Sequence, residues 1–582
     1  MKQQLQSLLE QAMQATAAAQ AVQLESCEPV QVERTRDNSH GDFASNVAMV
    51  NAKQFNTNPR QLAAELIKQI PADDAIEKIE VAGPGFINFY LRADAVSRIV
   101  PQILQQGAAF GRADFGQGQR VLVEFVSANP TGPLHIGHGR GAAYGDTVAG
   151  LLQNAGFEVS REYYVNDAGR QMDILGVSVW LRYLQDCGLD YPYPVQAYQA
   201  DYITTIARQL HERVGDDYSR PLDAVFTADW DGLDPELQLD RLIAYAGQEL
   251  GEDAFRAILD AGLDSIIASI RTDLEAFGVS FDTWFSERSL SADKQLQKCI
   301  DELQDSDKMY HKDGAYWFAS THYGDEKDRV VQRDNGSYTY FAADIAYHHN
   351  KFARGFDKVI NIWGADHHGY IKRVKASLQA LGADPDRLDI RLVQFATLYR
   401  GKEKVSMSTR SGEYVTLKEL VDEVGIDAAR FFYVMRKSEQ HLDFDLELAK
   451  SQSNDNPVYY IQYAHARICS VWKQLQEQSR HYDQEAGLAN LGLLDSESEQ
   501  QLMTLLSRYT EQVLNAALAC EPHSLCFYLQ ELAHGFHSYY NTHQFLTDND
   551  ALRNSRIALC LATKQVISNG LTILGVSAPE KM

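Results

Sequence analysis

The stretch that decides the fold is residues 120–165, RVLVEFVSANPTGPLHIGHGRGAAYGDTVAGLLQNAGFEVSREYYV. It opens with a run rich in Val and Phe, which predicts a strand over 120–129, and continues with apolar residues at helical spacing. A second strand is expected over 157–167. Strand, helix and strand in so short a stretch predict a βαβ unit, and therefore a parallel sheet with a right-handed crossover.

Two histidines stand between the first strand and the helix, in His135-Ile136-Gly137-His138. A helix N-terminus has unpaired N–H groups and a partial positive charge, which both suit phosphate. His135 and His138 are three residues apart, so one helical turn puts both on one face, where they can donate hydrogen bonds to a triphosphate. Gly137 and Gly139 would let a base or ribose approach closely.

Two histidines at this spacing, taken without other signals, are more often structural or part of a metal site than part of a nucleotide site. Metal binding would need a third ligand, and none is signalled nearby. The preceding strand and following helix favour the nucleotide interpretation.

Three domains are expected along the 582 residues. Strand-like stretches at 338–344, 358–366 and 390–399 extend the first βαβ unit into a doubly wound α/β catalytic domain over 116–424. Residues 1–115 alternate helical and strand-like patterns, which indicates an α+β domain. Residues 425–582 are nearly all helical in pattern and predict a helix bundle.

The net charge of −25 argues at first against a nucleic-acid partner, because phosphate binding needs clustered Lys and Arg. Most of that charge lies in one segment, residues 186–307, which has 26 Asp and Glu against 9 Lys and Arg. The segment has a helical pattern, and we expect an acidic helical insertion whose charges form a solvated face. The remaining catalytic segments are close to neutral, so the whole-chain charge does not exclude a nucleic acid.

Other classes of protein are excluded by composition. No apolar run reaches the roughly 20 residues of a membrane span, and the Gln-rich N-terminus is typical of an amphipathic helix and not of a signal peptide. The seven cysteines are dispersed and form no C-x-x-C pair, so we expect reduced thiols in a cytoplasmic protein without structural zinc.

At this point the sequence resembles the class I aminoacyl-tRNA synthetases, and among them the arginyl-tRNA synthetases. His135-Ile136-Gly137-His138 matches their HIGH signature. Further matches follow in the order of the family and cover essentially the whole chain: Gly41-DFASN, Glu124-FVSANPTGP, Glu162-YYVNDAGRQ, Tyr338-TYFAADIAYH, Trp363-GADHHGY, Asp427-AARFFYVMR and Asp455-NPVYYIQYAHARICS. The resemblance implies arginine–tRNA ligase activity. The arginine carboxylate would attack the α-phosphate of ATP, with Mg²⁺ accompanying the nucleotide, and a ribose hydroxyl of tRNA(Arg) would then take the acyl group.

The resemblance also implies site residues. Those expected at ATP are His135, Gly137, His138, Asp366, His367, Gly369, Met407 and Ser408, and those expected at L-arginine are Glu124, Asn129, His135, Tyr340 and Asp344. A guanidinium is planar with five donors, so its site needs acceptors in a fixed fork, which suits Asp344 and Tyr340. Tyr340 could equally be a core aromatic at a strand end, whereas an unpaired carboxylate at Asp344 in an apolar stretch is hard to explain structurally.

The sequence departs from the family at its second signature, the KMSKS loop. The matching residues are Ser406-Met407-Ser408-Thr409-Arg410, in which both signature lysines are missing. The lysine that some arginyl-tRNA synthetases carry just before HIGH is also missing. We therefore expect Lys404, or Lys402, and Arg410 to supply the positive charge beside His135 and His138, although solvated loop charges are an equal alternative.

The family match places tRNA on the two outer domains. The C-terminal bundle would bind the anticodon through aromatic and basic residues, and the N-terminal domain would contact the outer corner of the tRNA. The residues expected at tRNA are Tyr459, Tyr460, Gln462, Tyr463 and Arg467 in the bundle, with Asn38 and Asn46 in the N-terminal domain. The acidic insertion should lie away from the tRNA backbone, and we expect a monomer.

Two other functions remain open from the sequence. Another class I synthetase, such as a cysteinyl enzyme, would need zinc-ligand cysteines, and Tyr340 with Asp344 weighs against it. A non-catalytic tRNA-binding paralogue is supported only by the missing lysines and is opposed by the intact His135 and His138.

Overall fold

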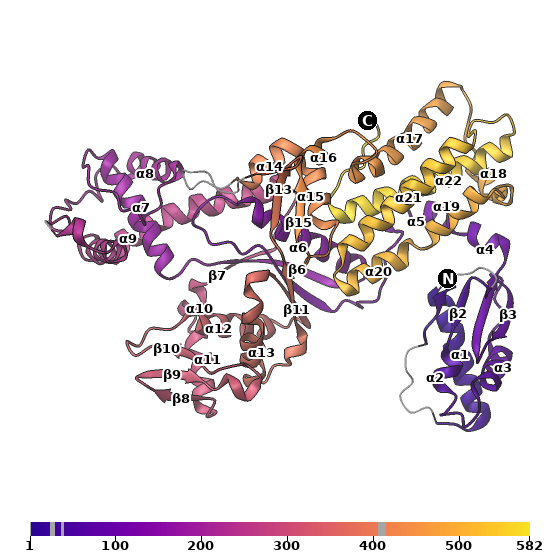
Figure 1. The fold of residues 1–582 in the computed structure, drawn as a ribbon, viewed down its shortest axis with the longest axis horizontal. Coiled ribbons are helices and arrows are strands. Elements are labelled where there is room, and N and C mark those ends of the chain that lie inside the picture. The colour runs from indigo at the N-terminus through magenta and orange to yellow at the C-terminus, as the bar shows by residue number, and fades with distance from the viewer. Residues whose placement is uncertain (1, 24–29, 36–39, 228, 406–414) are drawn as a thin grey trace.

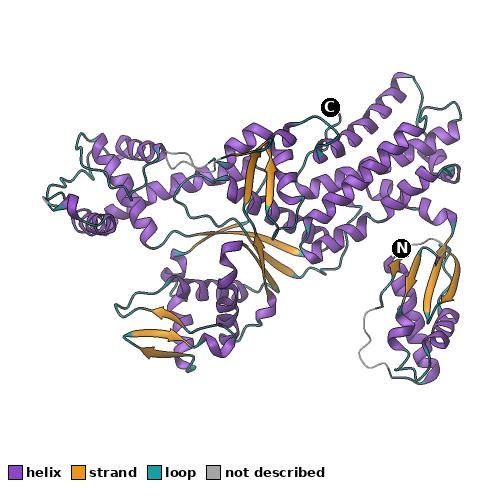
Figure 2. Cartoon of the chain, in the orientation of Figure 1, coloured by secondary structure: helices purple, strands orange, loops and turns teal. Residues whose placement is uncertain are grey.

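The computed structural model describes the chain except for residues 1, 24–29, 36–39, 228 and 406–414. Its centre is a five-stranded parallel sheet in the order β12-β11-β5-β6-β7 (Figures 1 and 2). These strands are β5 (Arg120–Glu124), β6 (Glu158–Val165), β7 (Thr283–Ser286), β11 (Lys358–Gly364) and β12 (Leu388–Val393). The expected βαβ unit is β5, α6 (Ile136–Asn154) and β6.

Alternation along β5 explains why helices cover both faces of this sheet. Val121 and Val123 belong to the large core cluster that contains α6, whereas Leu122 packs with Val374 of α13 (Ile371–Ala380) on the other face. Successive side chains of a strand point to opposite faces, so an uninterrupted apolar strand needs cover on both sides. The doubly wound α/β class predicted from the sequence is confirmed.

Several predicted elements differ in extent. The first strand ends at Glu124 and not at 129, because Val126 and Ser127 turn the chain with φ of 68° and 41°. The strand expected over 338–344 is the start of a helix, α12 (Tyr340–Ala353), whose apolar residues repeat at helical spacing and are buried. The strand expected over 390–399 is broken after Val393, and its second half, β13 (Ala396–Arg400), lies in another sheet with β14 (Glu403–Lys404) and β15 (Leu442–Asp445).

The acidic segment 186–307 is helical only in part. Its helices α8 (Asp201–Val214) and α9 (Pro235–Ala276), with α7 (Arg170–Asp186), form the lobe at the left of Figure 1, and α9 is kinked at Gly251. The segment then returns to the central sheet as β7, and α10 (Arg288–Ala292) and α11 (Gln295–Asp305) follow. The prediction of an all-helical insertion was wrong at β7, since four residues of half-buried strand carry too short a pattern to be recognised.

A small lobe and a separate N-terminal domain complete the α/β part. The lobe is an antiparallel sheet of β8 (Met309–Lys312), β9 (Ala315–Phe318) and β10 (Arg329–Gln332). The N-terminal domain has a sheet in the order β1-β2-β4-β3 and its own core. Its elements are α1 (Lys2–Gln20), β1 (Glu33–Arg34), β2 (Phe43–Ser45), α2 (Val47–Asn51), α3 (Pro59–Gln69), β3 (Ile76–Ala82) and β4 (Phe86–Leu91). The short helices α4 (Ala93–Ser97) and α5 (Ile99–Gln106) lead on to β5.

The C-terminal part is a helix bundle. Its elements are α14 (Leu417–Val424), α15 (Ile426–Val434), α16 (Leu446–Lys450), α17 (Pro457–Glu477), α18 (Gln484–Ala489), α19 (Glu497–Ser507), α20 (Tyr509–Ala519), α21 (Pro522–Thr542) and α22 (Asp550–Leu574). By length and composition α22 could cross a membrane, but 67% of its most apolar window is buried in the bundle. It is therefore the core helix of a packed domain.

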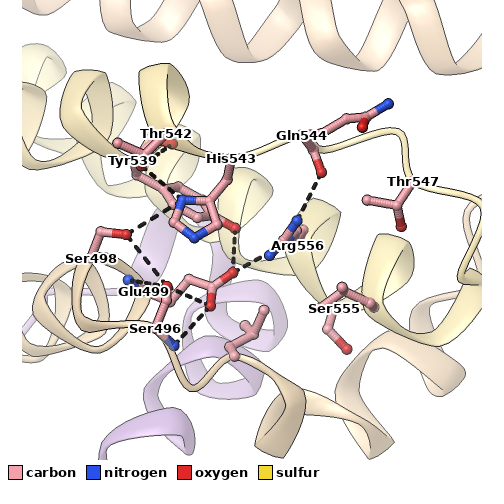
Figure 3. A network of polar contacts seen from close by, with 12 residues as sticks. Ser496, Ser498, Glu499, Tyr539, Thr542, His543, Gln544, Thr547, Ser555 and Arg556 are labelled. Carbon is pink, nitrogen blue, oxygen red and sulfur yellow. Dashed lines mark hydrogen bonds and ion pairs between the residues drawn. The ribbon is translucent and has the colours of Figure 1, made fainter.

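A buried carboxylate joins three helices of this bundle (Figure 3). Glu499 is 1% exposed and closes a capping box with Ser496 at the start of α19. Its Oε1 also accepts from Arg556 Nε of α22 at 3.0 Å and from the Tyr539 hydroxyl of α21 at 3.2 Å. One side chain thus satisfies donors from α19, α21 and α22.

Replacing Glu499 by alanine is expected to destabilise the bundle by about 3 kcal/mol, because removal of one partner leaves a largely buried guanidinium without its counter-charge. Thermal melting of the full chain measures the effect. Glu497→Ala is the matched control, since Glu497 lies exposed in the same helical turn. Equal melting temperatures for the two variants would show that the network contributes nothing to stability.

Candidate functional site

The two histidines form the N-terminal cap of α6. His135 is the N-cap, in extended conformation, and its Nδ1 accepts the N–H of Gly137 at 3.1 Å. His138 Nδ1 accepts the N–H of His135 at 3.3 Å, and the two rings stack with centroids 3.7 Å apart. The histidines therefore share one face, as expected, but through a reciprocal cap and not through successive helical positions.

Both imidazoles are neutral donors in this arrangement. Burial lowers the pKa of His135, and burial with the neighbouring His135 lowers the pKa of His138 to about 3. Because Nδ1 accepts a backbone hydrogen in each ring, the hydrogen of each neutral ring is assigned to Nε2. The pair thus offers N–H donors at the positive end of a helix, and the lowered pKa of each ring favours its neutral form.

The two glycines of the motif, Gly137 and Gly139, lack side chains for different structural reasons. A side chain on Gly139 would meet Leu417 at 2.7 Å and Tyr433 at 2.9 Å, so this glycine permits close packing of α6 against α14 and α15 and not the approach of a ligand. Tyr433 also donates to the carbonyl of Ile136 at 2.9 Å. Gly137 is half-buried, and a side chain there would meet the His135 ring at 2.8 Å, so this glycine admits the capping imidazole and the expectation that it leaves space for a ligand was wrong.

The described residues that follow the loop of the second signature contact the histidine motif. Met407, Ser408 and Arg410 lie outside the described residues. On the C-terminal side of the loop, the carbonyl of Val415 accepts the N–H of Ile136 at 3.1 Å, and Thr416 forms a bridge with His135. On the N-terminal side, Lys404 of β14 is the register partner of Tyr399 of β13. The side chains of Lys402 and Lys404 are exposed.

Five acidic side chains gather around the carboxyl ends of the parallel strands. Three have firm internal partners: Glu124 pairs with Lys351, Glu162 pairs with Arg354 at 2.5 Å, and the Asp167 carboxylate accepts from the Ser286 hydroxyl at 2.5 Å and the Arg288 N–H at 3.0 Å. The other two are Glu287 and Asp344. Each is hydrogen-bonded to a tyrosine, Tyr164 and Tyr370 respectively, and within the described parts of the chain neither lies in a salt bridge.

The carboxyl groups of Glu287 and Asp344 are therefore not paired with a cationic side chain among the described residues. Burial, and in smaller part the charges of Asp344 and Asp167, raise the pKa of Glu287 to about 7. Burial raises the pKa of Asp344 to about 6, although the Tyr370 hydroxyl opposes this effect. Two half-buried carboxyls whose proton affinity is raised in this way mark a site for an external cation. Sequence reasoning missed Glu287, whose only local signal is its position directly after β7.

The other residues expected at the substrates are also at the strand ends. Asn129 is exposed and its Oδ1 accepts from Asn166 at 3.1 Å. Tyr340 is 58% exposed at the first position of α12, with its ring beside Gly169, so the alternative of a core aromatic was wrong. Asp366, His367 and Gly369 are exposed on a short 3₁₀ helix, Ala365–Tyr370, that follows β11.

A second cluster lies on α17 and α21 of the bundle. The rings of Tyr459 and Tyr463 stack with centroids 5.9 Å apart, and the Arg467 guanidinium lies 4.4 Å from the centre of the Tyr463 ring. Arg467 also lies 4.8 Å from the ring of Tyr540, a neighbour that the sequence did not indicate because it is 73 positions away. Half-exposed aromatic rings around a cation suit unstacked bases.

Two other predicted tRNA residues of the bundle face inward. Gln462 is buried, and its amide donates to Asp427 at 2.7 Å and to the carbonyl of Ser577 at 2.9 Å. Tyr460 is half-buried against His537, with ring centroids 4.5 Å apart. In the N-terminal domain, Asn46 is half-buried at the start of α2, and Asn38 lies outside the described residues.

One group of possible metal ligands occurs among the described residues. Atoms of Cys187, His211 and Asp216 lie within 4.8 Å of one another. However, His211 already bridges Asp186 at 2.6 Å and Asp216 at 3.2 Å, and the Asp186 hydrogen bond raises its pKa. A protonated imidazole between two carboxylates has no lone pair for a metal, so the ion triad accounts for the arrangement.

Comparison with known proteins gives a consistent picture along the chain. Residues 3–91 match the family model described as the arginyl tRNA synthetase N terminal domain. Residues 99–215 and 249–453 match the model for the class I (R) tRNA synthetase catalytic domain. Residues 461–582 match the DALR anticodon binding domain. The gap in the catalytic match falls inside the acidic segment.

Whole-chain relatives agree. The chain is 55% identical, over the full length of both proteins, to an arginine–tRNA ligase of Thioalkalivibrio sulfidiphilus. It is 57% identical to one of Hydrogenovibrio crunogenus over 95% of each protein. A structure of a putative arginyl-tRNA synthetase from Campylobacter jejuni matches 84% of this chain and all of its own, with TM-score 0.73 and 32% identity. The Thermus thermophilus arginyl-tRNA synthetase shares the fold over the whole of both chains, with TM-score 0.75 and 22% identity.

Proposed function

The chain belongs to the class I arginyl-tRNA synthetases and ligates arginine to tRNA for translation at the expense of ATP, and from that premise we propose which of its residues do the work. The observation that carries the proposal is the pair Glu287 and Asp344, two half-buried carboxyls without a salt bridge among the described residues. We assign the guanidinium of arginine to this pair. A guanidinium is planar and has five donors in a fixed fork, so it can bind carboxylates in the bidentate geometry that a lysine ammonium or a neutral side chain does not offer.

The remaining arginine contacts follow from this placement. Tyr340, exposed beside Gly169, would cover the guanidinium, and Asn129 would hold the ammonium or carboxylate end near His135. Glu124 is 5% exposed and has Lys351 and Ser127 as partners, so it supports the substrate from within the protein. Substrate specificity then depends on which carboxylates the protein leaves unpaired.

The efficiency of arginine use should fall in acid. Raised pKa values mean that Glu287 is half protonated near pH 7 and Asp344 near pH 6, and a neutral carboxyl no longer attracts a guanidinium. We expect kcat/KM for arginine in aminoacylation to decline below pH 7 and more steeply below pH 6. The matching value for ATP, measured at saturating arginine, should change less. A flat arginine profile from pH 5.5 to 8 would refute the assignment.

The nucleotide would lie over the cap of α6. The Nε2 hydrogens of His135 and His138 would donate to the phosphates, with the partial positive charge of the helix end behind them. Asp366, His367 and Gly369, at the end of β11, would contact the adenosine, as the family match suggests. Gly137 would serve the same site indirectly, because it admits the His135 ring. Mg²⁺ would accompany ATP and reduce the charge of the phosphates.

Lys404, Lys402 and Arg410 would replace the missing signature lysines. We expect Lys404→Ala to lower kcat about tenfold, and Lys402→Ala/Lys404→Ala about a hundredfold, because the charge on the leaving pyrophosphate then loses its nearest cations. Arginine-dependent pyrophosphate exchange with tRNA present measures this, with Arg410→Ala tested in parallel. Lys418→Ala is the control, an exposed lysine beyond the loop that pairs with Asp422. Near-normal kcat in all of the loop variants would eliminate the proposal.

On the bundle, we propose that Tyr459, Tyr463 and Arg467, together with Tyr540, bind the anticodon by stacking. Tyr460 would support them through His537, and Gln462 would hold α17 to α15 from inside. Asn38 and Asn46 remain proposed contacts of the N-terminal domain. We propose further that the enzyme is a cytoplasmic monomer without structural zinc. The six described cysteines are free thiols, which suits a reducing compartment.

A further inference from the structure

A lysine is buried beneath the arginine site. Lys351 of α12 is 0% exposed, and its ammonium pairs with the carboxylate of Glu124 and donates to Asn361 Oδ1 at 2.8 Å. The ammonium also lies 4.2 Å from the centre of the Tyr347 ring. A buried charge is costly unless it is paired and hydrogen-bonded, so a lysine in this position needs an explanation.

The partners of Lys351 stand at the ligand edge of the sheet. Glu124 ends β5, and Asn361 is its register partner in the neighbouring parallel strand β11. Side chains that are register partners point to the same face, and ligands of such sheets bind beyond the carboxyl ends of the strands. Lys351 therefore reaches two adjacent strands directly below the substrate position.

One chain of hydrogen bonds, which we call the first arm, leads from Lys351 through Glu124 to a strained turn. The second oxygen of Glu124 accepts from Ser127 Oγ at 2.9 Å, and Ser127 Oγ accepts the N–H of Tyr164 at 3.1 Å. Val126 and Ser127 have φ of 68° and 41°, in the left-handed region that a β-branched residue such as valine strongly disfavours. Such strain persists only where the surroundings impose it. The turn leads directly to Asn129.

The other arm runs through Asn361 to the helix that carries Asp344. Asn361 Nδ2 donates to His348 Nε2 at 2.8 Å, and His348 Nδ1 donates to the carbonyl of Asp344 at 2.8 Å. Burial lowers the pKa of His348 to about 3, so the ring is neutral and can accept at one nitrogen while donating at the other. Every link in this arm has its partner.

We propose that Lys351 is a positioning residue for arginine: it fixes, through Glu124 and Ser127, the turn that presents Asn129, and, through Asn361 and His348, the turn of α12 that presents Asp344. The proposal rests on the assignment of the guanidinium to Glu287 and Asp344. It explains why a strongly acidic site contains a lysine that cannot itself reach the substrate. Lys351 neutralises Glu124 and leaves the other two carboxyls for the guanidinium.

The test is Lys351→Met, which keeps an unbranched side chain as far as the Cε position and removes the ammonium with its charge and hydrogen bonds. We expect kcat/KM for arginine to fall about a hundredfold, as for misplaced substrate groups, while KM for ATP changes little. The acid limb of the arginine profile, which is the decline of kcat/KM for arginine with falling pH, should also move to higher pH. The groups that act on Asp344 are Glu124, Lys351, Arg373 and Tyr370, together with Glu287, whose own pKa the charge of Asp344 raises. Lys351 is one of the two cations that lower the pKa of Asp344.

Two further variants keep the test decisive. Lys351→Met/Glu124→Gln removes both charges, so the melting temperature and the acid limb should return towards wild-type values while arginine kcat/KM stays low. Arg556→Met is the matched control, because it breaks a similarly enclosed ion pair, with Glu499, in the bundle. It should lower the melting temperature without moving the acid limb.

Each result has one meaning. The proposal would be overturned if Lys351→Met kept the wild-type kcat/KM for arginine and an unshifted pH profile. Full recovery of kcat/KM for arginine in the double variant would also overturn it, because Lys351 would then serve only to balance the charge of Glu124. If the single variant does not fold, the double variant alone decides. A wild-type profile that is flat in acid would refute the assignment to Glu287 and Asp344 instead, so the two failures are distinguishable.

Discussion

Replacing His138 by asparagine is expected to lower the rate of arginyl-adenylate formation by about 10²–10³-fold without unfolding the protein. The Nδ1 of His138 accepts the N–H of His135 at 3.3 Å, and an asparagine carbonyl oxygen can take over that capping bond. The lost group is the Nε2 hydrogen, which would donate to the charge that develops on the α-phosphate. Arginine-dependent pyrophosphate exchange with tRNA present measures the rate, and thermal melting verifies the fold.

His138→Gln is the matched variant for this prediction. A glutamine amide nitrogen can extend to the region of the missing Nε2, so we expect it to keep more activity than asparagine while capping less well. Because the pKa of His138 is about 3, the wild-type rate at saturating arginine should show no titration of this histidine between pH 6 and 8. A His138→Asn variant with near-normal kcat would rule out the donor role.

Replacing Glu287 by glutamine is expected to lower kcat/KM for arginine by about 10²–10³-fold, because loss of one partner from a buried charge pair costs roughly 2–5 kcal/mol. Asp344→Asn should have a similar effect. The loss should also reduce discrimination against citrulline, a neutral isostere of arginine whose urea oxygen would lie against a carboxylate in the wild type. Aminoacylation with arginine and with citrulline as competing substrates gives the ratio of the two kcat/KM values.

Glu326→Gln is the control for these variants. Glu326 is exposed and forms a surface ion pair with Lys372 at 3.1 Å, so its loss should leave both substrates unaffected. The acid limb of the arginine profile should simplify in Glu287→Gln to the single titration of Asp344 near pH 6. An unchanged arginine-to-citrulline ratio in Glu287→Gln would show that the guanidinium binds elsewhere.

Residues close together in sequence allowed most of the fold to be predicted. The run 120–165 contains a strand, a phosphate-type helix start and a second strand, and the structure has β5, α6 and β6 in that order. The C-terminal helices were readable because amphipathic periodicity is a local property. The failures were local ambiguities: 338–344 alternates like a strand but begins α12, and β7 is too short to carry a pattern.

The candidate site divides in the same way. His135 and His138 are recognisable because their role depends on three consecutive peptide units and a helix end. Glu287 was not recognisable, since nothing near it in sequence shows that Asp344, 57 positions later, will lie close enough to raise its pKa. Gly139 was misinterpreted for the same reason, because the Tyr433 ring that excludes a side chain there comes from α15.

The sequence by itself determined the parallel sheet, the helix bundle and the family, because periodicity, capping and motif spacing act between neighbouring residues. Only the tertiary structure decided which carboxylates are free. Lys351 neutralises Glu124 and Arg354 neutralises Glu162 across long stretches of chain, and Glu287 and Asp344 remain without a salt bridge among the described residues. Charge compensation acts through space at a few ångströms, and only folding brings these partners within that range.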